Sequence, residues 1–192
     1  KLEGSLKHFE FANDIKGMQQ DLFGEKKSIP LNYIVKDTDH PNDMLLLGTE
    51  VNGSCQRVDG MPSFNKGLVG YMMDGKNRAV AVVDETGRIV ARSLIRLLWD
   101  ATLNKPVLLQ ERFYGDKSFE EIVREMCVQR ATKLQIPLVI SKGEFDGDKE
   151  KKAYPNTLEA LESSVPFEYV DSAGGIREAP YSIEQTKIVY ES

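Results

Sequence analysis

Several features that define particular protein classes are scarce in this sequence. Its 192 residues include two cysteines, Cys55 and Cys127, and two histidines, His8 and His40. Two cysteines this far apart make neither a disulfide framework nor the ligand spacing of a zinc site, so we expect a reducing compartment and no metal. No apolar run approaches the roughly 20 residues that span a bilayer, and no charged-then-apolar signal segment is present. We therefore expect no membrane partner.

Positive charge is also scarce. Lys and Arg number 25 against 30 Asp and Glu, a formal net charge of -5. A mildly acidic chain does not neutralise a phosphate backbone over a broad surface, so we expect no nucleic-acid partner. A local basic pocket for a small anion is compatible with this net charge. The partner is then a small molecule or another protein, which the sequence does not identify.

The expected location is the cytoplasm. Two segments, GTEVNGSCQRVDG and ARSLIRLLWD, resemble uncharacterised C-terminal domains in large proteins of intracellular bacteria, a resemblance that implies no activity. If the chain belongs to such a protein, delivery into a host cytosol is the alternative. Its first residue is Lys, as in a trimmed chain or a piece of a longer protein.

What the sequence does contain is typical of a globular protein with its own core. Hydrophobic residues make up 41% and charged residues 29%, and the length suits a single domain. The pattern predicts an α+β fold with a mixed, mostly antiparallel central sheet flanked by helices. We expect residues 1–76 to form an N-terminal helix and loop-rich extension, packed on the same core as residues 77–192.

The extension has one strong helical signal. Phe11, Ile15, Met18 and Leu22 recur at helical spacing, which places them on one face of a helix over residues 5–23. Weaker signals predict a strand over 31–35, a loop over 36–43, a strand over 44–51 and a helix over 62–73.

The pattern sharpens into an antiparallel meander after residue 77. Two β-rich runs, 78–83 and 88–99, flank a Gly-containing turn, which is typical of a hairpin. A third strand is predicted over 107–112. The remaining predictions are a helix over 118–135, a strand over 136–140, a solvated loop over 142–152, a helix over 157–163 and two final strands over 167–170 and 183–190.

The order of these elements over residues 78–190 resembles the GCN5-related N-acetyltransferase (GNAT) fold. In that family a strand after the hairpin runs into the helix that holds the pyrophosphate of acetyl-CoA. The family loop there has Arg or Gln, then Gly, then a second small residue; Arg112 and Gly115 match, and Lys117 replaces the second small residue. The resemblance implies that acetyl-CoA or a related acyl-CoA is bound by Gln110, Arg112, Gly115, Lys117 and Ser118.

The chemistry of this loop admits two interpretations. A Gly-bearing loop lets backbone amides approach a phosphate, and the start of a helix adds a favourable dipole. Ser118 is expected to cap that helix, with Glu121 completing a capping box. Asp116 would repel phosphate, however, and acidic residues such as Glu120 in a first turn usually complement the dipole with no ligand. The alternatives are an anion site and an ordinary capped helix.

Glu111 is the candidate general base. It ends the third strand of the meander, where the resemblance implies a carboxylate that deprotonates the attacking amine. The alternative, which we favour, is an ion pair with Arg92, Arg96 or Arg112 on the sheet. The Tyr general acid of the family has no counterpart in the predicted helix over 157–163. This departure favours a non-catalytic interaction module that keeps the fold.

Cys55 supports an alternative function, a cysteine hydrolase or amide-modifying enzyme. It precedes the predicted helix over 62–73, and a thiol near a helix start can act as a nucleophile. No histidine follows it, so His40 would have to be its base. A small buried hydrophobic residue is the simpler interpretation, which also applies to Cys127.

Three arginines recur every four residues along the second strand of the meander. Arg88, Arg92 and Arg96 therefore share one face. They could line a site for an acidic partner, and a solvated sheet face is the interpretation that we favour.

Overall fold

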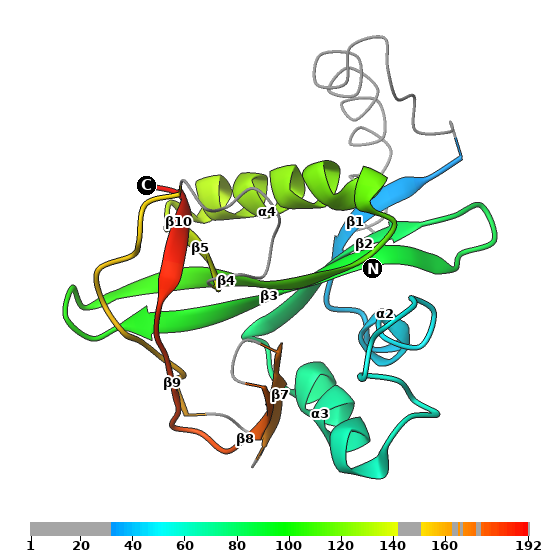
Figure 1. Ribbon diagram of the computed structural model, residues 1–192, viewed down its shortest axis with the longest axis horizontal. Coiled ribbons are helices and arrows are strands. Elements are labelled where there is room, and N and C mark those ends of the chain that lie inside the picture. The colour runs from blue at the N-terminus through cyan, green and yellow to red at the C-terminus, as the bar shows by residue number, and fades with distance from the viewer. Residues whose placement is uncertain (1–31, 142–150, 163–164, 166, 172–173, 192) are drawn as a thin grey trace, which may run out of the picture.

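The computed structural model describes residues 32–141, 151–162, 165, 167–171 and 174–191, and a twisted mixed sheet dominates it (Figure 1). Across the main path of the sheet the strands are β1 (Ile34–Thr38), β2 (Asn77–Val83), β3 (Ile89–Asp100), β4 (Lys105–Gly115), β5 (Leu138–Ser141) and β10 (Thr186–Tyr190). All neighbouring pairs are antiparallel except β4 and β5, which are parallel. The predicted α+β class and mostly antiparallel sheet are confirmed. The helix predicted over residues 5–23 lies outside the described residues.

Four short strands and four helical segments complete the described chain. The strands are β6 (Leu158–Glu159), which pairs with β3 and β9 (Ser182–Ile183), and β7 (Glu168–Val170) and β8 (Gly175–Arg177), which form a separate two-stranded sheet. The helical segments are α2 (Pro41–Leu46), α3 (Pro62–Met73), the 3-10 turn η2 (Lys117–Phe119) and α4 (Glu120–Leu134). None of the helices in the described ranges is long and apolar enough to cross a membrane.

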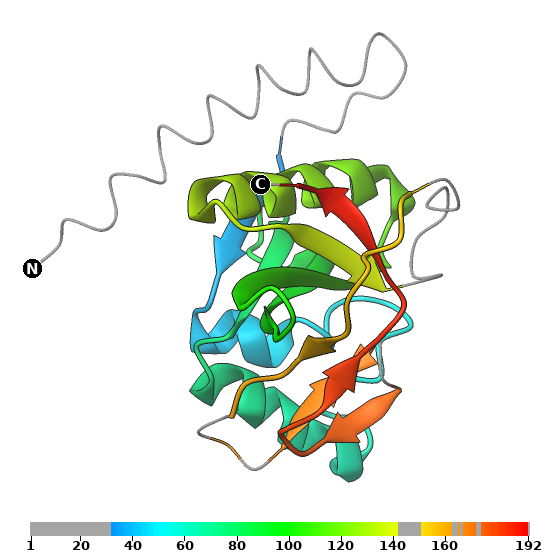
Figure 2. The ribbon, with the colours of Figure 1, turned by 90° about the vertical axis from the view of Figure 1, so that its left-hand side faces the viewer.

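The two faces of the sheet are covered by different elements. Figure 2 shows α4 along one face, and α2, α3 and the β7–β8 hairpin on the other. The α4 side buries a core of apolar residues from β2, β3, β4, β5 and the helix, including Val80, Ile95, Leu108, Leu138, Val123 and Met126. The opposite side divides into one apolar cluster around α2 and α3 and another beneath β6 and β9. Both faces are thus buried.

The meander forms where the turn chemistry predicts it. Asp84 accepts hydrogen bonds from the backbone amides of Thr86 and Arg88 at 2.9 and 3.0 Å, and Gly87 has a φ of 86°. That positive φ is costly for a residue with a Cβ atom, so glycine suits the last turn position. The predicted hairpin is confirmed by the register of β2 and β3, from Asn77↔Arg96 to Val83↔Ile89.

Two predicted elements are wrong, and the loop predicted over 36–43 contains the end of β1 and the start of α2. Residues 44–51, predicted as a strand, begin inside the helix α2, which extends to Leu46, and continue as turns. His40 caps this helix by accepting from the amide of Asn42 at 3.3 Å. Residues 157–163, predicted as a helix, contain strand β6, because Leu158 pairs with Ile183 and is fully buried. In both places, packing onto the sheet outweighs a short local pattern.

Asp100, at the end of β3, ties the returning chain to the sheet. Its buried carboxylate accepts from the Tyr154 hydroxyl at 2.6 Å and the Asn156 amide at 2.8 Å. Burial raises the pKa of Asp100, but hydrogen bonds from Asn156, Tyr154 and nearby backbone amides outweigh burial and hold the pKa below its usual value. The ionised carboxylate therefore stabilises the folded protein.

This arrangement predicts an acid-sensitive contribution to stability. Because the folded pKa lies below the unfolded pKa of about 4, the contribution is complete above that pH and is lost as the pH falls through the folded pKa. We expect Asp100→Asn to lower the free energy of unfolding at pH 7 by about 2 kcal/mol. The loss should shrink below about pH 4, measured by urea unfolding across pH. An equal loss at pH 7 and pH 2.5 would contradict the assignment.

Candidate functional site

The candidate site lies where the pairing of the two parallel strands ends, a place that we call the β4–β5 fork. Strand β5 pairs only with Leu108–Gln110 of β4, while β4 runs on to Gly115. Strand β4 also carries a bulge, because two steps from Ser93 to Ile95 on β3 oppose three steps from Gln110 to Phe113. The two strands therefore share register only at one end, and β4 continues beyond its last partner in β5.

Gln110 lies where the pairing ends. It shares a face with Leu108, two residues earlier, which packs under α4, so its side chain is on the α4 side of the sheet. The side chain is fully buried, yet neither the amide nitrogen nor the amide oxygen has a hydrogen-bond partner among the described residues. Leaving both polar atoms unsatisfied is costly, so the side chain is suited to a ligand that both accepts and donates.

The loop after β4 differs from the sequence prediction in how its helix begins. Helix α4 starts at Glu120 with Phe119 as its N-cap, so Ser118 is not its cap. Instead, the Asp116 carboxylate accepts from the Ser118 amide at 2.8 Å and caps the 3-10 turn η2. A side chain of this chain thus occupies one of the amides expected to receive a phosphate.

Gly115 is held at this point by the neighbouring strand. Its φ is 126°, and a Cβ atom there would lie 2.5 Å from the Ala91 Cα and 2.6 Å from the Val90 carbonyl oxygen. Both the backbone conformation and the close approach of β3 therefore require glycine. The glycine of the predicted loop has a packing role whether or not a phosphate binds.

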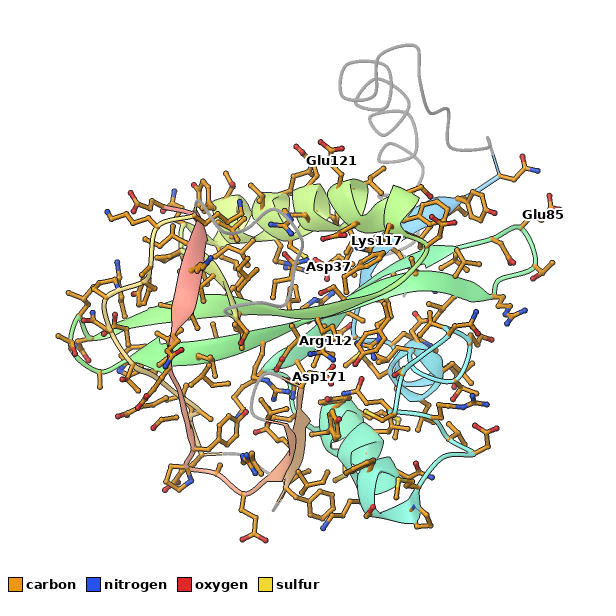
Figure 3. All side chains as sticks on the ribbon, viewed as in Figure 1. Asp37, Glu85, Arg112, Lys117, Glu121 and Asp171 are labelled. Carbon is orange, nitrogen blue, oxygen red and sulfur yellow. The ribbon has the colours of Figure 1, made fainter. Side chains whose placement is uncertain are left out.

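The two basic side chains predicted to bind a phosphate are exposed but lie apart. Figure 3 shows Lys117 beside the start of α4, and Arg112 on the other side of the strands, toward Asp171. Glu120 and Glu121 add negative charge in the first turn of the helix. Of the two cations, Lys117 is thus the one placed to approach an anion at the helix start.

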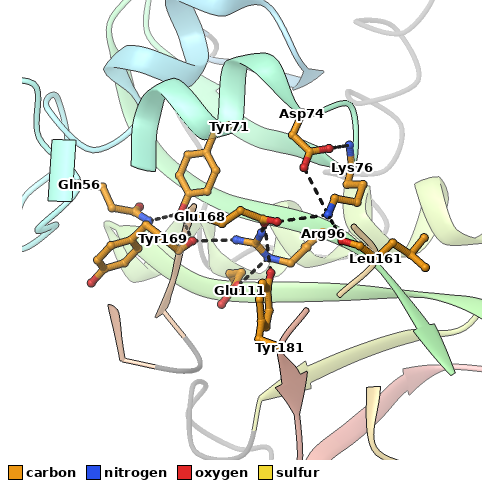
Figure 4. Close-up of polar contacts among 10 residues, drawn as sticks. All are labelled: Gln56, Tyr71, Asp74, Lys76, Arg96, Glu111, Leu161, Glu168, Tyr169 and Tyr181. Carbon is orange, nitrogen blue, oxygen red and sulfur yellow. Dashed lines mark hydrogen bonds and ion pairs between the residues drawn. The ribbon is translucent and has the colours of Figure 1, made fainter. Parts of the chain in front are cut away.

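Glu111 belongs to a buried ionic cluster on the face opposite α4 (Figure 4). Its carboxylate accepts from Arg96 Nε at 3.2 Å, and both side chains are only 1% exposed. The favoured alternative to a free base, an ion pair on the sheet, is therefore present. A carboxylate at this position is within the interior and oriented by a guanidinium.

Glu168, from β7, completes the cluster. It pairs with Arg96 Nη1, with Lys76 Nζ at 3.2 Å and with the Tyr181 hydroxyl at 3.1 Å. Lys76 also pairs with Asp74 at 3.3 Å. Burial lowers the pKa of Arg96, but Tyr181, the two glutamates and Tyr71 outweigh it and raise the pKa above its usual value. Arg96 therefore stays charged.

The hairpin that carries Glu168 is joined to the main sheet by side chains. Arg96 Nη2 donates to the Tyr169 carbonyl at 2.8 Å, and the Tyr71 hydroxyl donates to the same oxygen at 2.6 Å. Gly67 of α3 lets the hairpin approach, since a Cβ atom there would lie 2.6 Å from the Tyr169 Cβ. The hairpin therefore closes the α3 side of the sheet over Arg96.

The arginine stripe is not the solvated face that the sequence favours. Arg88 is exposed, but Arg92 and Arg96 are 0% and 1% exposed. The prediction fails because α3, the segment before it and the β7–β8 hairpin cover this face of β3. A strand pattern alone does not reveal which face other elements will cover.

Cys55 and His40 are not brought together as a catalytic pair. Cys55 Sγ lies 2.7 Å from the Tyr169 hydroxyl, and His40 Nδ1 is occupied by the amide of Asn42. No hydrogen bond joins Cys55 to His40, both of which lie in the described ranges. Cys127 packs in the α4 core, as expected, and burial raises the pKa of its thiol.

Comparison with known proteins finds similarity of fold and no similarity of sequence family. No family model matches the sequence, and no curated protein matches it either. Solved structures that resemble the chain include an aminoglycoside acetyltransferase from an uncultured soil metagenomic sample, in complex with trehalose, and a ribosomal-protein-alanine N-acetyltransferase from Brucella melitensis. Their identities are 12% and 11%, both with TM-scores of 0.46, over 62% and 60% of this chain and 83% and 84% of those chains.

A GCN5-related N-acetyltransferase from Sphaerobacter thermophilus is also similar, at 16% identity and a TM-score of 0.36 over 62% of this chain and 41% of that one. These similarities are low, and they carry no activity or site residue over to this chain. The chain thus has a weak resemblance to the GNAT fold.

Proposed function

We propose that this chain binds an acyl-CoA at the β4–β5 fork and transfers the acyl group to an amine. The observation that carries the proposal is the buried Gln110 amide, which has no partner among the described residues and lies at the last position of β4 that pairs with β5. The pantetheine arm of an acyl-CoA contains amide groups that donate and accept hydrogen bonds, so it complements both atoms of this side chain.

The other residues of the fork have separate roles in this proposal. Lys117, exposed beside the start of α4, meets the phosphates, while Gly115 keeps the loop close to β3. The Ser118 amide remains a candidate phosphate ligand after release from Asp116, whereas Arg112, on the other side of the strands, has no role in this proposal. Acyl-CoA supplies an activated thioester carbonyl. The amine nitrogen attacks this carbonyl, the C–S bond breaks, and CoA leaves as a thiolate. Glu111, oriented by Arg96, takes the proton from the amine and returns it to the leaving sulfur.

Gln110→Leu provides the sharpest test, because binding and stability should change in opposite directions. Removing an unsatisfied buried amide in favour of an apolar side chain of similar size should leave stability unchanged or raise it by about 1 kcal/mol. The same substitution should weaken acetyl-CoA binding about tenfold, as expected for the loss of hydrogen bonds in a buried site. Isothermal titration calorimetry and urea unfolding measure the two effects.

Matched lysine variants control for charge. Lys117→Gln should weaken acetyl-CoA binding several-fold, whereas Lys133→Gln removes the same charge in the last turn of α4 and should not. Absence of binding heat with millimolar acetyl-CoA in the folded wild-type protein would defeat the proposal.

The second candidate function is a non-catalytic interaction module. It is favoured by two internal contacts, that of Asp116 with the Ser118 amide and that of Glu111 with Arg96, which occupy groups that an acyltransferase would use. This alternative predicts no response to acetyl-CoA and no acyl transfer to any amine. The calorimetric titration therefore distinguishes the two functions.

A further inference from the structure

Two arginines on the same face of β3 differ in how their charge is compensated. Arg96 is paired with Glu111 and Glu168. Arg92, four residues earlier and 0% exposed, makes no ion pair within the described part of the chain. The nearby Asp171 carboxylate accepts from the Tyr114 hydroxyl at 3.1 Å instead. A buried guanidinium without a carboxylate is unusual, because burying an unpaired charge is costly.

Neutral groups hold the Arg92 side chain in place. Its Nε donates to the Leu47 carbonyl at 3.1 Å, and Nη2 donates to Ser54 Oγ at 2.9 Å and to Gln56 Oε1. The guanidinium carbon lies 4.0 Å from the centre of the Tyr114 ring. These contacts orient a planar cation and leave its net charge uncompensated. The remaining nitrogen, Nη1, is buried and has no hydrogen-bond partner in the part of the chain that the structure describes.

We propose that Arg92 binds a carboxylate group of the amine that accepts the acyl group. A carboxylate matches the planar guanidinium, and it would supply both the missing charge and the missing partner of Nη1. Arg92 is opposite Tyr114 on β4, on the same face as Glu111 and Arg96. The acceptor class is then amino acids and related amino-carboxylates, an assignment that rests on the proposed acyl transfer.

Cys55 gives a direct reporter of this site. It lies between Ser54 and Gln56, the two residues that hold Arg92 Nη2, and is itself half-buried beside the Tyr169 hydroxyl. A ligand held at Arg92 should therefore restrict access to the thiol. Cys127 is buried in the α4 core and should not contribute to labelling of the folded protein.

The test compares amino acids with their carboxamides on the full chain without any acyl-CoA. We expect millimolar glycine, L-alanine or L-phenylalanine to slow iodoacetamide labelling of Cys55 and raise the melting temperature, and the matching carboxamides to do neither. Arg92→Lys, which keeps the charge but loses the planar fork, should weaken the protection about tenfold or more. Arg88→Gln removes the exposed charge four residues before Arg92 and should leave the protection of Cys55 unchanged.

The outcomes separate this proposal from the proposed function. Equal effects of acids and amides, or no effect of either on the folded wild-type protein, would overturn the carboxylate site, with Nη1 then satisfied by water alone. Undiminished protection in folded Arg92→Lys would also overturn it. If that variant does not fold, the comparison of amino acids with their carboxamides on the wild-type protein still tests the carboxylate site. If acetyl-CoA does not bind in calorimetry but amino acids still slow the labelling of Cys55, the proposed acyl transfer is wrong and the carboxylate site stands.

Discussion

Replacing Glu168 with glutamine is expected to lower the free energy of unfolding by about 3–5 kcal/mol, the usual effect of removing one partner from a buried ion pair. The carboxylate is 1% exposed and meets Arg96, Lys76 and Tyr181. Glutamine has nearly the same shape, but its amide would face two cations with less negative charge. Urea unfolding at pH 7 measures the loss.

Asp59→Asn is the matched control for Glu168→Gln. Asp59 pairs with Arg57 at 3.0 Å on the surface, where water screens both charges. We expect no measurable change in stability from this control. If Glu168→Gln proved equally neutral, the cluster in Figure 4 would not be what joins the β7–β8 hairpin to the main sheet.

Replacing Gly115 with alanine is expected to lower the free energy of unfolding by about 3 kcal/mol or more, since strain and a backbone clash act together. The new Cβ atom would lie within 2.6 Å of the Val90 carbonyl, an atom that cannot move without shifting β3. The same change should displace the loop that precedes α4. Acetyl-CoA binding is then expected to weaken in any variant that remains folded.

Gly87→Ala separates backbone strain from the clash. Gly87 also has a positive φ, 86°, but nothing lies within 4 Å of the Cβ position. We expect this variant to lose only about 1 kcal/mol, the cost of a left-handed conformation for a residue with a side chain. Equal losses of unfolding free energy in Gly115→Ala and Gly87→Ala would show that the clash with β3 adds nothing to the cost of backbone strain.

Sequence patterns located most of the strands because their signals are local. The hairpin of β2 and β3 has β-branched runs on either side of an Asp-to-Gly turn, and α3 spans Pro62–Met73 as predicted. The short segments were predicted less well. Strand β6 contains only two residues, and their conformation depends on partners in β3 and β9 that lie far away along the chain.

The candidate site was only partly accessible to sequence reasoning. The sequence places the candidate site over residues 110–118, which form the end of β4 and the start of η2, and it includes Glu111 with Arg96 among the expected ion pairs. Glu168, Lys76 and Tyr181 were not anticipated, because no motif joins residues from three separate segments. The spacing of Gly67 and Gly70 on α3 is a signal that another segment approaches closely, but it does not say which.

The sequence by itself determined the α+β class, the antiparallel meander and the helix that follows it, because turn residues and apolar periodicity act over a few neighbouring positions. Only the tertiary structure decided which charges are buried. Arg92 and Arg96 have the same local pattern, yet the β7–β8 hairpin brings a carboxylate to Arg96, while the hydrogen-bond partners of Arg92 among the described residues are neutral. Long-range packing sets the electrostatic environment of each residue, and local sequence does not encode it.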